Sequence, residues 1–117
     1  MYRILVEYLA NMALTDAELS PKLETVGETG VSHSMIADDK GNIYLTNSLN
    51  IAIRYVTADG KLETLVKDKC LISPDTLSVG ANGCLYLTCP QIKRTKKYNG
   101  GKDKVEYPFR LYKIKLP

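Results

Sequence analysis

The feature that most constrains this chain is a six-residue segment that occurs twice. Gly41-Asn42-Ile43-Tyr44-Leu45-Thr46 returns as Gly83-Cys84-Leu85-Tyr86-Leu87-Thr88, 42 residues further on and without a gap. In each copy, a glycine that suits a turn leads into aromatic and branched aliphatic residues, which is typical of a strand inside an antiparallel sheet. Internal repetition at this spacing predicts two structural units of the same kind.

The remaining sequence is expected to alternate between strands and tight turns. Turn residues occur at 39–41, 58–60 and 81–83, between runs with strand character. The expected strands are Lys22–Val26, Met35–Asp38, Asn42–Asn47, Ala52–Thr57, Lys61–Val66, Thr76–Val79, Cys84–Cys89 and Phe109–Leu116. The polar, basic stretch Pro90–Pro108 interrupts them and is expected to be a long exposed loop.

Two pairs of these segments repeat each other. Lys22–Val26 is a near copy of Lys61–Leu65, and its alternation of polar and apolar residues predicts an outer strand with one face on the core. The final strand resembles the opening Met1–Ile4. The end of the chain therefore repeats the pattern of its beginning.

The N-terminal stretch carries mixed signals. Tyr2–Met12 alternates as a strand does, yet its apolar residues also fall at helical spacing, so we expect a strand in its first half and a helical turn in its second. Thr15 and Glu18 have the spacing of a capping box, and Pro21 stops a helix soon after it. One short helix is therefore expected near residues 16–20.

The strands repeat at about 40 residues, four to a unit, which is the period of a β-propeller blade. The predicted fold class is all-β, with antiparallel four-stranded blade-like sheets and about two blades in the chain. We expect one partial domain over residues 1–117, with a lead-in over 1–30 and blades over 31–69 and 70–117.

Composition narrows the class of protein. An apolar content of 44% and a charged content of 25% are ordinary for a globular domain. No apolar run approaches the roughly 20 residues that cross a bilayer, and Glu7 interrupts the region where a signal peptide would be apolar. We expect a cytoplasmic protein without a membrane partner.

The three cysteines, Cys70, Cys84 and Cys89, match no zinc or redox spacing. Cys84 and Cys89 are expected to leave opposite faces of one strand, so they cannot easily form a disulfide. We expect all three to be buried or half-buried free thiols, and we predict neither a cofactor nor a metal site.

Much of the chain resembles one known family. The segments concerned are Tyr2–Ile4, Leu14–Leu19, Ser32–Ile53, Lys61–Val66, Ser73–Thr88 and Asn99–Leu116. Together they resemble the yellow and major royal jelly protein family, across nearly the whole chain but only the C-terminal third or so of the family's usual length. The resemblance implies a six-bladed propeller, related in architecture to calcium-dependent lactonases.

The chain departs from the family pattern where chemistry would be expected. Relatives tend to have Asp-Gly at the head of the inner strand, whereas this chain has His33-Ser34 in one unit and Asp75-Thr76 in the other. After the Tyr-Leu-Thr strand they tend to have an Asp and then a Glu, where this chain has Asn47-Ser48-Leu49. Fewer carboxylates weaken the expectation of metal-dependent chemistry.

Candidate ligand-binding residues follow from the repeat. His33 and Asp75 are equivalent under the 42-residue shift, so both are expected at the mouth of the propeller channel. They could contact a ligand or act as an acid–base pair; alternatively, each caps local backbone. The candidate set is His33, Ser34, Asn47, Asn50, Asp75, Thr76 and Cys89.

No catalytic residue is predicted. The serines and cysteines lack a nucleophile elbow, and His33 is the one histidine that could serve as a base. The basic run Lys93–Lys97 could contact nucleic acid, but acids elsewhere leave a net charge of only +3, so nucleic-acid binding is not expected. The chain is therefore not expected to be an enzyme.

Two stacked blades leave apolar sheet faces at both ends, and such faces normally find a partner. We expect a homo-oligomer and favour a trimeric ring, which would total six blades, over a dimer. The expected function is a self-associating module that binds a small organic ligand. A metal-dependent lactonase-like hydrolase and a functionless gene fragment are the alternatives.

Overall fold

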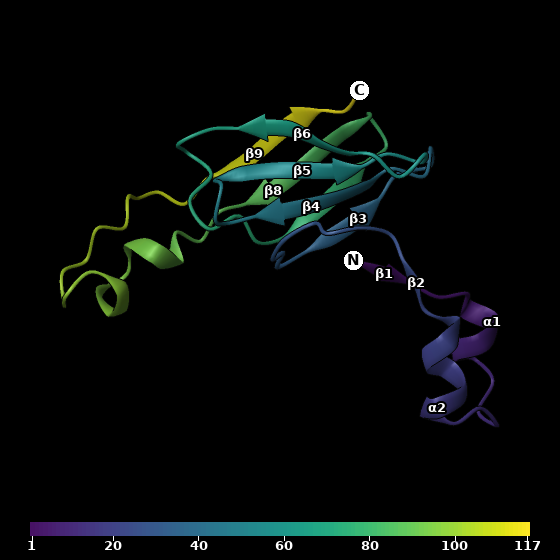
Figure 1. Cartoon of the computed structure of the whole chain (residues 1–117). Helices are drawn as coiled ribbons and strands as arrows, with labels where there is room; N and C mark the ends of the chain where they lie inside the picture. The colour runs from purple at the N-terminus through teal and green to yellow at the C-terminus, as the bar shows by residue number, and fades with distance from the viewer.

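The structure is a computed structural model that describes all of residues 1–117 (Figure 1). Its first sheet has four antiparallel strands in the order β3-β4-β5-β6, at Met35–Ala37, Ile43–Asn47, Ala52–Val56 and Leu62–Lys67. Its second sheet has three, β7-β8-β9, at Leu77–Gly80, Cys84–Thr88 and Leu111–Lys115. The all-β class is confirmed, although the second sheet lacks the fourth strand that the sequence predicts.

An N-terminal lobe precedes the sheets and projects away from them (Figure 1). Its elements are β1 at Tyr2–Arg3, α1 at Val6–Leu9, α2 at Asp16–Leu19, the 3₁₀ helix η1 at Ser20–Lys22 and β2 at Glu24–Thr25. The predicted change from strand to helical turn is thus confirmed. The capping box is also present, because the Glu18 carboxylate accepts hydrogen bonds from the backbone N–H and the hydroxyl of Thr15, both at 2.8 Å.

The predicted outer strand at Lys22–Val26 is wrong in its packing. Only Glu24 and Thr25 are in a strand, which pairs with β1, and both are exposed. None of residues 1–25 is buried, and Leu5, Val6, Leu9 and Met12 are exposed large hydrophobic residues. The local pattern specified a strand correctly, but the lobe lies away from the core that the pattern implied.

The two copies of the repeated segment fold alike. Tyr44 of β4 pairs with Ile36 of β3, and Tyr86 of β8 pairs with Ser78 of β7 at the equivalent register. Each hairpin continues beyond the strands: Thr46 N–H donates to the Ser34 carbonyl, and Thr88 N–H to the Thr76 carbonyl, both at 3.2 Å. The repeat therefore encodes backbone pairing as well as side-chain type.

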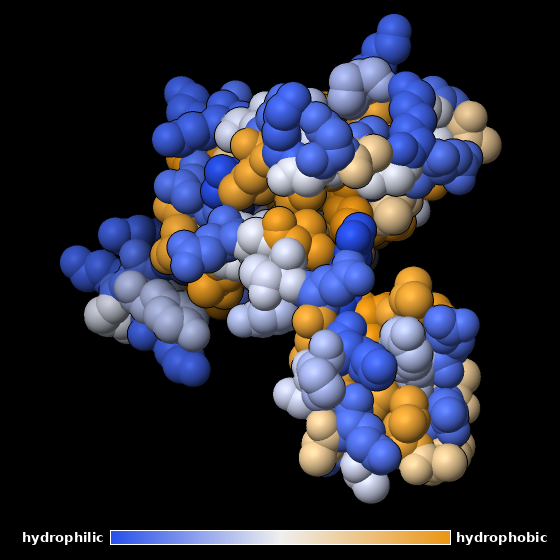
Figure 2. All heavy atoms as spheres, turned by 45° about the vertical axis from the view of Figure 1, so that its right-hand side comes forward, coloured by the Kyte–Doolittle hydropathy of each residue, from blue (hydrophilic) through white to orange (hydrophobic).

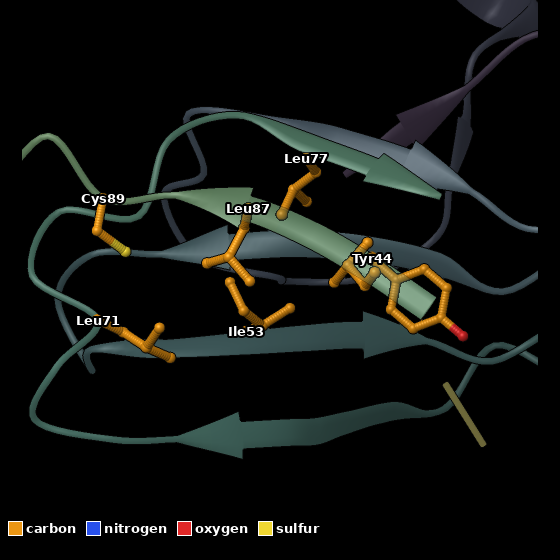
Figure 3. Close-up of a cluster of buried hydrophobic side chains, with 7 residues drawn as sticks. Tyr44, Ile53, Leu71, Leu77, Leu87 and Cys89 are labelled. Carbon is orange, nitrogen blue, oxygen red and sulfur yellow. The ribbon is translucent and has the colours of Figure 1, made fainter. Parts of the chain in front are cut away.

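The two sheets stack face to face, and the main core lies between them (Figure 3). The cluster consists of Tyr44, Ile53, Leu71, Leu77, Leu85, Leu87 and Cys89, all buried. On the opposite face of the first sheet, Leu45, Ala52 and Val56 are also buried but lie outside this cluster. The first sheet therefore has apolar residues on both faces.

A hydrogen-bond network fixes one end of β4. The Tyr44 hydroxyl donates to Asp38 Oδ2 at 2.9 Å, and the same carboxylate accepts from the backbone N–H groups of Asn42 and Lys40. Burial opposes ionisation of Asp38, but hydrogen bonds from Asn42, Tyr44 and Lys40 outweigh it and lower its pKa. Burial, with the hydrogen bond to Asp38, raises the pKa of Tyr44 to about 12.

We expect the stability that Tyr44 contributes to be present below pH 10 and to be lost as the pH rises toward 12. The reason is that the folded state retains the phenol proton across a range in which the unfolded chain, with a pKa of about 10, releases it. Absorbance titration of tyrosinate, compared between the wild type and Tyr44→Phe, checks this. A Tyr44→Phe curve that retains the transition near pH 12 would contradict the assignment.

The connection between β8 and β9 is long and mostly exposed, as predicted, and it extends away from the sheets (Figure 1). It contains two short 3₁₀ helices, η2 at Ile92–Arg94 and η3 at Lys96–Tyr98. No helix in the chain combines the length and hydrophobicity that crossing a bilayer requires.

The chain exposes more surface than a compact domain of its size. Its accessible surface is 7974 Å², whereas a folded monomer of this mass should expose roughly 6,300 Å². Its radius of gyration is 17.0 Å, against about 13 Å for a compact chain. Figure 2 shows hydrophobic side chains at the surface of both the sheet body and the N-terminal lobe.

Candidate functional site

The structure places the first group of predicted ligand residues at one end of β4. The backbone N–H groups of His33 and Ser34 donate to Thr46 Oγ1 at 3.0 and 3.1 Å, and the His33 imidazole is exposed and makes no hydrogen bond. Asn47 is buried, and its Oδ1 accepts from the backbone and side-chain N–H groups of Asn50. These contacts build the turn through backbone groups and the Asn47 amide, and the His33 side chain neither caps backbone nor meets another candidate residue.

The second group lies at the equivalent end of β8. Asp75 N–H donates to the Thr88 carbonyl at 3.0 Å, and Thr76 is exposed. No hydrogen bond joins the side chains of His33 and Asp75, which the repeat made equivalent. Among the predicted residues, Cys89 lines two adjoining cavities.

The residues present do not fit the calcium that the family resemblance implies. No three His, Cys, Asp or Glu side chains lie close enough together to hold a metal ion. Calcium takes six to eight oxygen ligands, usually including several carboxylates.

The two copies of the repeat turn opposite faces toward the space between the sheets. Tyr44 points toward the second sheet, and its equivalent Tyr86 points away from the first, because Leu87 on the other face of β8 belongs to the shared core. The open face of the first sheet is thus the counterpart of the packed face of the second. Leu77 is 7% exposed in the stack, whereas Met35 at the equivalent position is 59% exposed.

The open face of the second sheet is different in character. Ser78 and Lys113 on this face are exposed, and Lys113 Nζ lies 5.9 Å from the centre of the Tyr86 ring. In the first sheet, the equivalent pair of Tyr44 and Tyr55 is stacked at 5.5 Å. The outer face of the first sheet therefore exposes Met35 beside a buried centre that includes Leu45, with Arg54 paired to Leu45, whereas the outer face of the second sheet is polar and basic.

A second candidate site lies where the long loop leaves β8. We call it the basic pocket; it is a cavity of about 260 Å³. Its lining residues are Lys69, Cys70, Ile72, Cys89, Gln91, Arg94, Glu106, Arg110 and Tyr112. Residues separated by more than 40 positions in the chain thus meet in one cavity.

Gln91 closes the base of the loop. Its backbone is left-handed, with φ 57, and its side chain is buried. Gln91 Nε2 donates to the Glu106 carbonyl at 2.8 Å, while Gln91 Oε1 accepts from Glu106 N–H at 3.0 Å and from Arg94 Nη1 at 3.2 Å. The amide thus pairs with Glu106 as a neighbouring strand would, and it helps to orient Arg94.

The charges in the basic pocket do not balance. Arg94 forms an ion pair with Glu106, with Nη1 and Oε1 separated by 2.6 Å. The side chains of Lys69 and Arg110 line the same cavity without any ion pair or hydrogen bond within the chain. Two cationic groups therefore remain available to a ligand.

An apolar pocket adjoins the basic one. It measures about 330 Å³ and is lined by Thr88, Cys89, Pro90, Phe109, Arg110 and Leu111. Cys89 and Arg110 line both cavities. Phe109 and Leu111 are exposed, so the apolar pocket opens to solvent.

Cys70 and Cys89 are poor nucleophiles. Burial raises the pKa of Cys89 to about 11, and a hydrogen bond with Asp68 together with partial desolvation raises the pKa of Cys70. A raised pKa leaves little thiolate at neutral pH. The prediction of buried or half-buried thiols is wrong for Cys70, which is exposed in the turn after β6, whereas Cys84 and Cys89 are buried.

The sequence marks little of the basic pocket. Its one electrostatic signal was the run Lys93–Lys97, of which Arg94 does line the cavity. Lys93 instead ties the loop to the first sheet, since its Nζ donates to the Ser48 carbonyl at 2.9 Å. No local pattern marked Lys69 or Arg110.

Comparison with known proteins adds no identity: no protein-family model matches this chain, and neither does any curated protein.

Proposed function

We propose that this chain is a non-enzymatic binding module that self-associates, as a segment of a propeller-like stack, and holds a small organic anion in the basic pocket. The observation that supports an anionic ligand is a pair of cationic side chains without ion-pair partners, Lys69 and Arg110. They line a cavity beside an apolar pocket. The planar guanidinium of Arg110 suits a carboxylate, which it can bind through two hydrogen bonds.

The lining of the apolar pocket indicates the chemistry of the uncharged part of the ligand. An anion on Arg110 with an aromatic or branched body would place that body against Phe109 and Leu111. Each cavity is at or below the low end of the usual 300–1,000 Å³ for ligand sites, so the ligand is small. An aromatic carboxylate such as phenylacetate has the required charge and size.

Phenylacetate should bind the chain in calorimetry at least about tenfold more tightly than phenylacetamide, its neutral isostere, because one charge-assisted pair supplies a free-energy difference of about 1.5–3 kcal/mol. Arg110→Gln should reduce phenylacetate affinity by a similar factor. Lys102→Gln removes the same charge from an exposed residue outside both pockets and should leave affinity unchanged. Equal binding of the two probes, or no binding of phenylacetate, would refute the site.

The open face of the first sheet supports self-association. The exposed apolar residues that this face offers are Met35, which is 59% exposed, and Ala37. Because the open face of the second sheet carries Lys113 rather than an apolar partner, we favour a two-fold dimer through the Met35 face over the trimeric ring that the sequence favours.

Light scattering at micromolar concentration should give twice the monomer mass of 13.0 kDa. Met35→Glu should shift the chain to monomer, because it places a charge in the apolar interface. The matched control is Met12→Glu, since Met12 is 94% exposed and lies in the N-terminal lobe. A wild-type monomer would rule out self-association.

No specific observation favours the lactonase-like alternative, since the residues offer neither a metal cluster nor an activated nucleophile. The functionless-fragment alternative would be excluded by selective binding of phenylacetate. Three free thiols fit a reducing compartment, which supports the proposed cytoplasmic location.

A further inference from the structure

The second sheet ends in an open strand edge. β9 pairs with β8 on one side only, whereas its counterpart β5 in the first sheet pairs with both β4 and β6. Tyr112 and Ile114 of β9 pack against the core, while Lys113 and Lys115 are exposed. An edge strand of this kind presents unpaired backbone groups that can template another strand.

The N-terminal ribbon repeats the pair of strands that is incomplete at β9. Tyr2-Arg3-Ile4 of the β1 region matches Tyr112-Lys113-Ile114 of β9, and Lys22–Thr25 matches Lys61–Thr64 of the β6 region. The register also matches. Arg3 pairs with Glu24 in the ribbon, as Tyr55 pairs with Glu63 between β5 and β6. In the order of the four-stranded sheet, β1 and β2 thus correspond to the third and fourth strands, β5 and β6. β9 corresponds to the third strand, and its sheet has no fourth.

We propose that β2 of a second copy of this chain pairs with the free edge of β9, as β6 pairs with β5. This partner deepens the self-association proposed above and rests on it. The register transferred from β5 and β6 puts Glu24 opposite Lys113 and Leu23 opposite Ile114. The first pair joins opposite charges across strands, and the second places Leu23 on the core side.

The exchange replaces a weak pairing with a better one. β1 and β2 share two residue pairs, their Arg3–Glu24 ion pair is exposed, and the lobe that holds them buries no residue. Leu23 is 49% exposed in the lobe. Beside Ile114 it would join the apolar layer between the sheets, and Glu24 would keep a cationic partner in Lys113.

The β2 strand that completes β9 belongs to another copy because the link is too short for the same chain. Thr29 is buried and Ser34 is bonded to Thr46, so residues 26–28 would form the link once Val26 and Gly27 give up their hydrogen bonds to Met1. Three residues span at most about 10 Å. The link begins beside Asn47 of the first sheet, and β3 of that sheet contacts β7 of the second. The position beyond β9 is three strand spacings past β7, or about 14 Å. Reciprocal exchange between two chains would form a closed dimer.

The test is a disulfide between chains that each carry one engineered cysteine. Glu24→Cys and Lys113→Cys are made separately, both with Cys70→Ser to remove the exposed native thiol. Mixing them with oxidised glutathione, which accepts the two thiol electrons, should give a disulfide-linked mixed dimer as the main product. Glu7→Cys mixed with Lys113→Cys is the control and should give little. Equal yields from both mixtures, or no linked dimer from the first, would overturn the proposal.

A charge exchange separates this inference from self-association in general. Glu24→Lys alone and Lys113→Glu alone should each raise the dimer dissociation constant about fivefold, and the double variant should restore it. A dimer that shows no restoration overturns the strand pairing and leaves the Met35 interface standing. Retained dimerisation in Met35→Glu, together with the mixed disulfide, would overturn the Met35 interface and leave the strand pairing standing.

Discussion

Leu85→Ala is expected to lower the free energy of unfolding by about 2–5 kcal/mol. Leu85 is fully buried in the cluster between the two sheets, so the truncation leaves a cavity that neither sheet can collapse to fill. Only 18 of the 117 residues are buried, so this cluster supplies a large share of a total stability that is typically about 5–15 kcal/mol. Urea unfolding followed by tyrosine fluorescence measures the change, since the chain has no tryptophan.

The matched control is Leu49→Ala. Leu49 is 73% exposed in the turn between β4 and β5, so the same truncation should change stability by no more than about 0.5 kcal/mol. If the two variants unfold at the same urea concentration, the packing of one sheet on the other is not what stabilises the chain.

Local signals in the sequence were sufficient for the strands. The hairpin of β3 and β4 and that of β7 and β8 were predicted because a turn glycine, Gly41 or Gly83, precedes a run with strong strand propensity in each. Both glycines have positive φ, which most other residues adopt only with strain. Such information lies within a few residues, and the 42-residue repeat doubles it.

Partners of strands were less predictable than the strands themselves. The pattern of Lys22–Val26 correctly indicates an extended segment, but it holds no information on which edge that segment meets. In the chain it pairs with β1 in an exposed lobe, and the second sheet is left with three strands. Pairing depends on residues that lie far apart in sequence, so a local pattern specifies the face of a strand and not its neighbour.

The binding pocket was the least predictable part. His33 and Asp75 were predicted as ligand residues because they occupy equivalent positions in the two copies of the repeat. In the structure, their backbone N–H groups form hydrogen bonds within turns. The cavity instead joins Lys69 from the turn after β6 to Arg110 from the end of the loop. Neither residue has a local motif, because their proximity results from sheet stacking and from the Gln91 amide.

Gln91→Gly is expected to release the base of the loop and to abolish the basic pocket. Glycine adopts φ 57 without strain, so the loss reports the side-chain amide and not the backbone conformation. Without that amide, the backbone N–H and carbonyl of Glu106 lose their partners, and Arg94 loses one of its two. Hydrogen exchange at the Glu106 amide should accelerate at least about tenfold, which corresponds to roughly 1.4 kcal/mol of local stability.

Ile51→Gly is the matched control for this variant, because Ile51 also has positive φ, at 48, and its side chain makes no hydrogen bond. It should leave exchange at Glu106 and phenylacetate affinity unchanged, whereas Gln91→Gly should weaken phenylacetate by at least about tenfold because Arg94 and Arg110 no longer face one cavity. Faster hydrogen exchange with unchanged phenylacetate affinity would show that the Gln91 amide holds the loop but that ligand binding does not depend on it. Unchanged exchange would show that the amide does not hold the loop closed.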